Sequence, residues 1–303
     1  MNVINSLLKL NLLGEIKLLN GLIDLMKPRV MSLVIFTCAV GLLTAPNHIY
    51  VFDAILSIGF VTLGAGAAGA LNMWYEADLD KLMSRTCLRP IPTGKVNKSQ
   101  ALIFGLALSV ISIYGLYYFS NILSALILSF TIFFYVVVYT VWLKRRTPQN
   151  IVIGGAAGAL PPVIGWTITT GNLSLEAVSF FLIIFFWTPS HFWALSLYKA
   201  DDYRLAKIPM LPVISGIQNT KINILVYSLL MLPVLYLPYH IGFVGNLFAI
   251  LCLPLTIYYN YICFDLYKDV QHKFNILKAK KVFSYSIIYL FAIFVLFLAD
   301  SFV

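Results

Sequence analysis

Long apolar stretches separated by short polar segments run along almost the whole chain. A helix needs about 20 apolar residues to cross roughly 30 Å of hydrocarbon. Nine stretches meet or approach this length: 28–45, 52–75, 101–120, 122–143, 151–170, 175–198, 222–240, 243–264 and 282–300. Tight connections at Ser120-Asn121 and at His240-Ile241-Gly242 predict that four of them form two helical hairpins. The pattern therefore predicts an all-α, polytopic membrane helical bundle with nine transmembrane helices.

The basic residues give this bundle an expected orientation. All 21 Lys and Arg residues fall into five segments on one side of the predicted membrane. These segments hold Lys9, Lys17, Lys27 and Arg29; Lys81, Arg85, Arg89, Lys95 and Lys98; Lys144, Arg145 and Arg146; Lys199, Arg204, Lys207 and Lys221; and Lys268, Lys273, Lys278, Lys280 and Lys281. Because cytoplasmic loops carry an excess of Lys and Arg, we expect the amino terminus in the cytoplasm and the carboxyl terminus outside. Topology then accounts for most of the net charge of +9, and no nucleic-acid partner is expected.

Composition excludes a water-soluble globule. The 303 residues are 60% hydrophobic and 11% charged, whereas soluble domains are about a quarter charged. The four cysteines have neither disulfide nor metal spacing. Residues 1–27 lack a small-residue cleavage site and are interrupted by Glu15, Lys17 and Asp24, which favours an interfacial amphipathic helix over a signal peptide. Residues 28–303 are then expected to form one membrane domain.

The few acidic residues cluster where the second span ends. Asn72, Glu76 and Asp80 recur every four residues and therefore share one face of a helix. Two carboxylates and an amide oxygen form a hard oxygen site of the kind that Mg²⁺ prefers. Asp78 points elsewhere on a regular helix. Isolated polar residues at a membrane interface are ordinary, but four within nine residues beside an apolar span indicate function.

Two arginines follow this stripe. Arg85 and Arg89 are four residues apart and run into the sequence Pro90 to Gly94. The planar guanidinium fork suits phosphate recognition, although simple topological anchoring is the better explanation of such a pair when it is taken alone. Next to carboxylates that hold a metal, the pair suggests a site for a diphosphate and its departure.

A second polar region closes the sixth span on the same side. It includes Asp201, Asp202 and Arg204. Within the span itself lies His191, and a histidine inside a membrane segment is a functional candidate. A structural histidine bonded to a carbonyl is an equally good interpretation of that residue on its own.

At these residues the chain resembles the UbiA superfamily of intramembrane prenyltransferases. The first superfamily motif, Asn-x3-Asp-x-Asp-x-Asp, corresponds to Asn72, Glu76, Asp78 and Asp80, with Glu in place of the first Asp. Similarity to the heme O branch of the superfamily rests on the segments 85–94, 143–150, 154–162, 189–195 and 202–212. The second superfamily motif usually reads Asp-x3-Asp, but the residue four after Asp202 is Ala206, a feature shared with that branch. Because alanine has no side-chain oxygen, this departure leaves fewer oxygen ligands for a second metal ion.

The resemblance implies a reaction in which farnesyl diphosphate, heme b and water give heme O and diphosphate. It implies a location in the bacterial inner (cytoplasmic) membrane, with the site on the cytoplasmic side. A heme A synthase or an oxidase assembly factor is an implied partner. The implied roles are Mg²⁺ binding by Asn72, Glu76, Asp80 and Asp202; diphosphate binding by Arg85, Arg89, Lys95 and Arg145; and heme binding by His191 and Trp193. His191 would ligate the iron, orient the porphyrin or take a proton from water.

Three alternatives remain at the level of sequence. Another UbiA-type enzyme would prenylate an aromatic or quinone precursor, and Ala206 and the segment around His191 argue against it. A transporter would place charges near the middle of the membrane on broken helices, whereas the acidic residues here gather at one rim. A non-catalytic heme-binding protein would have no need of Asn72, Glu76 or Asp80.

Overall fold

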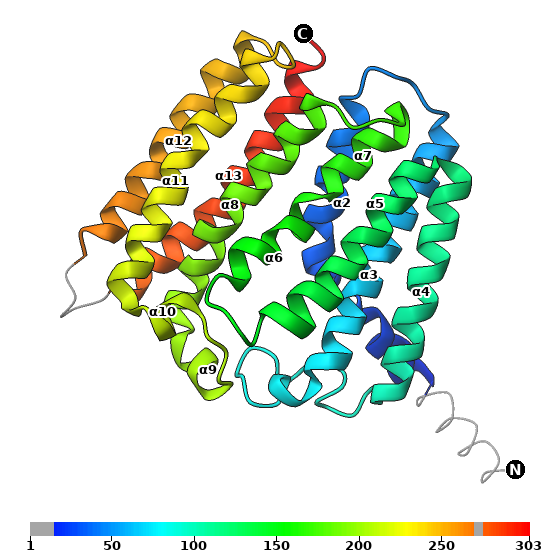
Figure 1. Ribbon diagram of the computed structural model, residues 1–303, viewed down its shortest axis with the longest axis vertical. Coiled ribbons are helices and arrows are strands. Elements are labelled where there is room, and N and C mark those ends of the chain that lie inside the picture. Colours follow the sequence, from blue (N-terminus) through cyan, green and yellow to red (C-terminus); the bar gives the residue numbers. More distant parts are fainter. Residues whose placement is uncertain (1–14, 270–274) are drawn as a thin grey trace, which may run out of the picture.

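The computed structural model describes residues 15–269 and 275–303. These residues form helices that run side by side along the long axis of the molecule, with no strand among them (Figure 1). Their bounds are α2 Pro28–Leu43, α3 Val51–Asp80, α4 Lys98–Phe119, α5 Ile122–Phe133, the π-helix η1 Phe134–Leu143, α6 Asn150–Ala159, α7 Pro161–Thr170, α8 Leu175–Tyr198, α9 Ala200–Leu205, α10 Leu211–Ile214, α11 Gly216–His240, α12 Asn246–Tyr267 and α13 Ile276–Asp300. A further helix, Glu15–Leu25, precedes α2.

The predicted membrane bundle is confirmed. Within the described residues, eight spans are long and apolar enough to cross a bilayer. The remaining predicted span, 28–45, corresponds to α2, which is shorter. It reaches this length only together with the helix Glu15–Leu25, from which it is bent by 47°. Residues 1–14 of the predicted interfacial segment lie outside the described residues, so the interfacial role of that segment stays a prediction.

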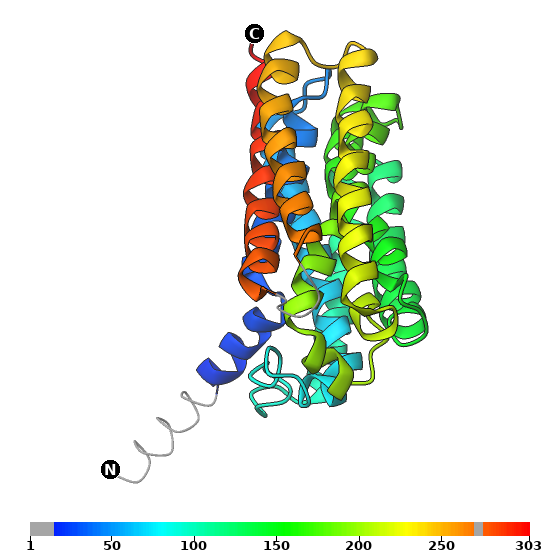
Figure 2. The ribbon, with the colours of Figure 1, turned by 90° about the vertical axis from the view of Figure 1, so that its left-hand side faces the viewer.

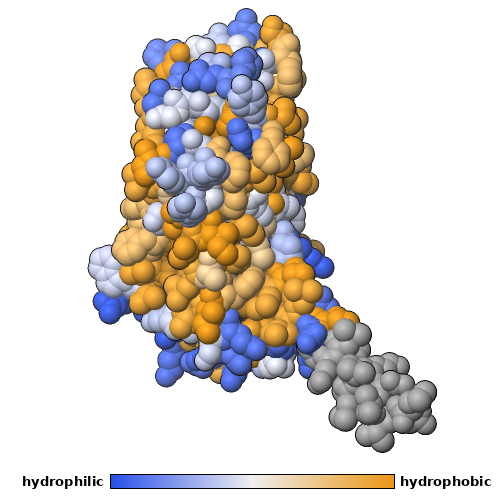
Figure 3. All heavy atoms as spheres, turned by 90° about the vertical axis from the view of Figure 1, so that its right-hand side faces the viewer, coloured by the Kyte–Doolittle hydropathy of each residue, from blue (hydrophilic) through white to orange (hydrophobic). Residues whose placement is uncertain are grey.

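The two ends of the bundle differ in character. The connections α3–α4, η1–α6, α8–α11 and α12–α13 lie at one end, together with the helix Glu15–Leu25, and the carboxyl terminus lies at the other (Figures 1 and 2). The described Lys and Arg residues fall in or beside these connections, and we call this the basic end. On the face drawn in Figure 3, an apolar band separates the polar side chains at the basic end from further polar side chains toward the opposite end. The basic residues are therefore segregated as predicted, while their cytoplasmic placement stays a prediction.

Two spans depart from a simple α-helix. The predicted span 151–170 consists of α6 and α7, which meet at Leu160 before Pro161 and Pro162. A proline has no backbone N–H to donate, and its ring clashes with the carbonyl four residues earlier, which accounts for the break. The fourth predicted span changes from α5 to the π-helix η1 at Phe134 and remains π-helical to its basic end.

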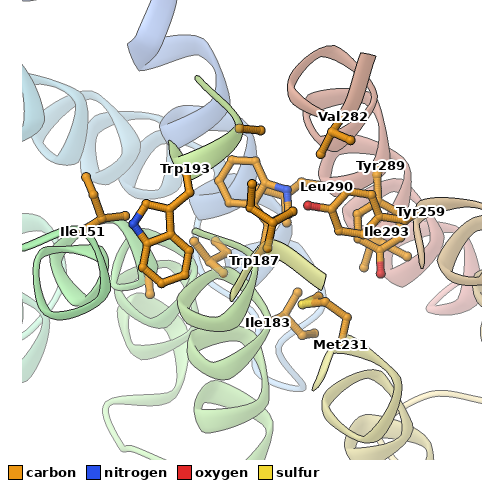
Figure 4. Packing of buried hydrophobic residues seen from close by; sticks show 14 of the residues in the cluster. Ile151, Ile183, Trp187, Trp193, Met231, Tyr259, Val282, Tyr289, Leu290 and Ile293 are labelled. Atoms are coloured by element: carbon orange, nitrogen blue, oxygen red, sulfur yellow. The ribbon is translucent and has the colours of Figure 1, made fainter. Parts of the chain in front are cut away.

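The core packs through small residues in one part and through aromatic rings in another. A Cβ atom on Gly165 of α7 would lie 1.9 Å from the carbonyl oxygen of Cys38 in α2, so these two backbones are in direct contact. Between α8, α12 and α13 the core is aromatic, and Figure 4 shows Trp187, Tyr259 and Tyr289 packed together. In the glycine-rich segment 154–158, Gly154 packs closely and leaves no room for a side chain beside Tyr139, whereas Gly158 has open space around it.

Candidate active site

The predicted polar stripe lies on one buried face at the basic end of α3. The exposed fractions of Asn72, Glu76 and Asp80 are 2%, 1% and 0%. The amide nitrogen of Asn72 donates to Glu76 Oε2 at 3.0 Å, so the first two members touch. Asp78 faces outward and pairs with Lys98 Nζ, which lies 3.1 Å from its Oδ2. The helical spacing in the sequence therefore predicted that Asn72, Glu76 and Asp80 share one face and that Asp78 lies on another.

Basic side chains from other segments neutralise the stripe. Lys27 Nζ, from the residue before α2, donates to Asn72 Oδ1 at 2.8 Å. Lys144 Nζ, from the residue after η1, lies 2.6 Å from Glu76 Oε2 and 2.5 Å from Oε1. Arg89 Nη1 donates to both carboxylate oxygens of Asp80, at 2.8 and 2.9 Å. A buried charge is tolerated only when it is paired and hydrogen-bonded, and each carboxylate here meets that condition.

The π-helix η1 completes the surroundings of Asn72. Thr140 Oγ1 accepts a hydrogen bond from the Asn72 amide at 3.1 Å and donates to the carbonyl of Tyr135, five residues earlier, at 2.8 Å. The i to i−5 spacing of that bond is the spacing of a π-helix. The wide turns of η1 thus place Thr140 on Asn72 and Lys144 on Glu76 at once.

The second polar region meets the first at Ser84. The hydroxyl of Ser84, four residues after Asp80, donates to Asp202 Oδ2 at 2.7 Å. Lys199 Nζ lies 3.4 Å from the same hydroxyl oxygen and 3.8 Å from Asp202 Oδ2. Asp201, in contrast, pairs with Arg204 at the surface. Two loops that are 118 residues apart in sequence therefore meet at the basic end, with Asp202 facing the α3–α4 connection.

Three predicted diphosphate ligands lie apart from the stripe in this structure. Arg85 is exposed on the α3–α4 connection. Lys95 Nζ lies 3.5 Å from Asp24 Oδ2 and so ties that connection to the helix Glu15–Leu25. The guanidinium of Arg145 lies over the ring of Tyr75, 5.1 Å from its centre. Of the predicted cationic ligands, only Arg89 contacts a carboxylate of the stripe.

The stripe supplies oxygen donors, but not a cluster of three acids. Among residues 15–269 and 275–303, no group of three or more His, Cys, Asp or Glu side chains is arranged to hold a metal ion. The donors that the stripe itself provides are two carboxylates and the Asn72 amide oxygen. These are hard oxygen ligands, and their chemistry fits Mg²⁺.

The two predicted heme residues lie on α8, toward the interior of the bundle. His191 stacks between Trp187 and Phe283, with ring centres 4.3 and 4.6 Å away. Its Nδ1 lies 2.6 Å from Ser286 Oγ on α13. Trp193 is fully buried, and its indole nitrogen has no hydrogen-bond partner among the described residues (Figure 4).

Several site residues were not singled out by the sequence. Thr140 and Ser286 are single hydroxyl residues within apolar spans, and only the packing of η1 on α3, and of α13 on α8, reveals their partners. Lys27 belongs to a basic segment that topology alone explains. Lys144 lies beside the predicted ligand Arg145, in a trio that the sequence offers as a diphosphate site and that topology explains equally well. Spacing along one helix finds residues that share a face, but it does not find partners from other helices.

Comparison with known proteins identifies the family. The sequence profile of the UbiA prenyltransferase family matches residues 33–287. The chain belongs to this family. As a UbiA protein it is a prenyltransferase, and the all-α membrane fold expected from the resemblance is confirmed.

Curated relatives of this UbiA protein match it along nearly its whole length. A protoheme IX farnesyltransferase of Pelagibacter ubique (strain HTCC1062) is 68% identical over 301 residues, which is 99% of each chain. Protoheme IX farnesyltransferase 2 of Mesorhizobium japonicum is 50% identical and covers 91% of this chain and 88% of its own.

Solved structures share the fold at low sequence identity. A structure of digeranylgeranylglyceryl phosphate synthase in membranes superposes with a TM-score of 0.77 at 18% identity, covering 94% of this chain and 98% of that one. A UbiA homolog from Archaeoglobus fulgidus bound to DMAPP and Mg²⁺ has a TM-score of 0.66 at 16% identity, covering 91% and 99%. At this identity the likeness concerns the fold.

Proposed function

We propose that this UbiA protein transfers the farnesyl group of farnesyl diphosphate to a vinyl group of heme b, with addition of water, to give heme O and diphosphate. The observation that carries the proposal is the buried stripe Asn72–Glu76–Asp80, held by cations at the basic end of the bundle. The 68% identical relative named protoheme IX farnesyltransferase supports the choice of substrates. The protein is proposed to act in the bacterial inner membrane, with the basic end in the cytoplasm.

The diphosphate would bind at the basic end. Arg89 and Lys144 already lie on the stripe, each on a carboxylate, and Lys27 lies beside them on Asn72. These cations would neutralise the charge that develops on the departing diphosphate. Arg85, Lys95 and Arg145 lie on the surrounding connections and are proposed to meet the diphosphate from outside. Asn72, Glu76 and Asp80 would hold Mg²⁺, assisted by Asp202 from α9, and the ion would supply further electrostatic stabilisation of the leaving group.

The acceptor would bind nearer the middle of the membrane. His191 lies seven residues before the end of α8, which corresponds to a depth of about 10 Å at 1.5 Å per residue. Breaking the bond from carbon to diphosphate oxygen creates an allylic cation, and the apolar bundle keeps water from that cation until the vinyl group adds to it. Bond formation moves the positive charge beside the porphyrin, where water supplies the hydroxyl group and releases a proton.

The test is an assay of membranes containing the protein, supplied with heme b, farnesyl diphosphate and Mg²⁺. We expect heme O to form, and to be abolished by EDTA and by Asp80→Asn. Asp78→Asn is the matched control: it removes one carboxylate from the same helix end, but from the outward face, and is expected to leave heme O formation unchanged. If Asp80→Asn retained full activity, the assigned site would be wrong. If a hydroxybenzoate replaced heme b as the better acceptor, the acceptor assignment would be wrong.

A further inference from the structure

One serine on α13 holds the buried histidine of α8 in place. The hydroxyl of Ser286 donates to the carbonyl of Phe283 at 2.6 Å. Its hydrogen is used in that bond, so its oxygen accepts from His191 Nδ1, which lies 2.6 Å away. His191 is therefore the tautomer with its hydrogen on Nδ1, and in a neutral ring this leaves the lone pair on Nε2.

The imidazole is also held in its plane. The ring of Trp187, on α8, stacks on the imidazole with an angle of 19° between the ring planes. The ring of Phe283, on α13, stacks on it with an angle of 25°. Ser286 fixes this stack as well, because its backbone carbonyl accepts from Trp187 Nε1 at 2.8 Å. A single residue thus sets both the rotation of the indole and the tautomer of the imidazole.

The remaining nitrogen of this ring has no partner among the residues that the structure describes. His191 is 7% exposed, and no described residue forms a hydrogen bond with its Nε2. A polar atom without a partner in a membrane segment is costly and marks a functional position. A histidine that ligates a metal almost always donates its other ring hydrogen to a fixed acceptor, which is the arrangement seen here.

We propose that Ser286 is a positioning residue that presents Nε2 of His191 to the iron of the porphyrin substrate. The inference rests on the proposed function for the identity of that substrate. It selects iron ligation from the three roles open to His191, because the histidine is immobilised in the manner of a metal ligand. Ser286 acts only through His191 and the stacked rings.

The test is a titration of the full-length protein, purified in detergent, with ferric heme b, followed by absorption and resonance Raman spectroscopy. We expect a histidine-ligated spectrum that is lost in His191→Ala and restored by added imidazole. Ser286→Ala is expected to weaken heme affinity about 10- to 100-fold, the range for loss of such outer hydrogen bonds. The frequency of the iron–histidine stretching band in the ferrous state should also fall, since the ring nitrogen loses a hydrogen-bond acceptor that raises ligand basicity.

A matched control separates positioning from a general loss of packing. Ser190→Ala removes a buried hydrogen bond of the same length, 2.6 Å to the hydroxyl of Tyr259, from the residue next to His191. It should leave the iron–histidine band unchanged. A histidine-ligated spectrum in His191→Ala would overturn the proposal, as would wild-type affinity and band position in Ser286→Ala.

The outcome is independent of the farnesyl transfer assay. Protein that ligates heme through His191 but forms no heme O would contradict the proposed function and leave this inference standing. Heme O formation together with heme binding that does not depend on His191 would support the proposed function and contradict this inference.

Discussion

At the scale of residues, each carboxylate of the buried stripe on α3 pairs with a basic side chain from another segment of the chain. Glu76 is 1% exposed and its partner Lys144 14%, so their ion pair is shielded from water. Removing one partner of a buried pair leaves the other charge uncompensated, which costs more than the pair itself contributes. Lys144 is therefore expected to stabilise the folded protein, in addition to its proposed role in binding the diphosphate.

We expect Lys144→Gln to lower the free energy of unfolding by roughly 3–5 kcal/mol, the usual cost of breaking a buried pair. Reversible unfolding in mixed detergent micelles measures this. The double variant Glu76→Gln/Lys144→Gln should recover part of the loss, because the uncompensated carboxylate is then gone. Arg146→Gln, which changes an exposed neighbour, should leave stability unchanged. Equal losses in Lys144→Gln and Arg146→Gln would contradict this account.

The sequence predicted the residues of the site better than their partners. Asn72, Glu76 and Asp80 follow from helical spacing, and so does the outward position of Asp78. Arg145 belongs to the same basic trio as Lys144, yet one lies over a tyrosine ring and the other on Glu76. That difference depends on the π-helical pitch of η1, which no pattern of apolar residues specifies. Ser286 gave no indication either, because a lone serine in a membrane helix is ordinary.

At the scale of elements, contact between α2 and α7 requires glycine. Gly165 faces the carbonyl oxygen of Cys38, and Gly41 faces that of Pro162, where an added Cβ would lie 1.9 and 2.1 Å from those oxygens. Both obstacles are backbone atoms, so no side-chain movement relieves them. Small residues at such crossings are typical of membrane helix packing.

Gly165→Ala is accordingly expected to destabilise the protein by about 1–3 kcal/mol, as overpacked cores do. Gly158→Ala on the neighbouring helix α6 is the control, because an added Cβ there meets nothing within 4 Å. It should be neutral or slightly stabilising, since alanine stabilises a helix more than glycine does. Thermal unfolding of both variants in one detergent tests the contrast, and an unaffected Gly165→Ala would show that α2 and α7 can separate freely.

The predictions for elements succeeded where apolar length decides the outcome. All nine expected stretches correspond to helices in the described residues, including the hairpin joined at Ser120-Asn121. The division of the fifth span at Leu160 was not predicted, although Pro161 and Pro162 mark it. An apolar count over twenty residues does not register a local break when composition stays the same on both sides.

At the scale of the whole molecule, the bundle has a polar asymmetry that defines its expected orientation. The basic connections lie at the end where α2 begins, and the acidic stripe lies just inside that end. If the basic end faces the cytoplasm, the diphosphate site is open to substrates from that side. A labelling experiment tests this orientation.

The native cysteines provide that experiment. Cys87 lies on the α3–α4 connection and is partly exposed, whereas Cys38, Cys252 and Cys263 are buried. A membrane-impermeant maleimide should label inside-out vesicles and spare intact cells. Cys87→Ser should abolish the labelling of vesicles. Labelling of intact cells that is lost in the same variant would reverse the proposed orientation.

The pitch of η1 has a consequence for how this site can change over evolutionary time. A single-residue deletion at lipid-facing Val137 would turn everything that follows by roughly the rotation of one residue, about 100° on an α-helix. The segment would still be long enough to insert, yet Lys144 would swing away from Glu76 and Thr140 from Asn72. Descendants carrying such a deletion would keep the membrane scaffold while losing its anion-handling chemistry, which makes this stretch a natural point of divergence between enzyme and inert paralogue.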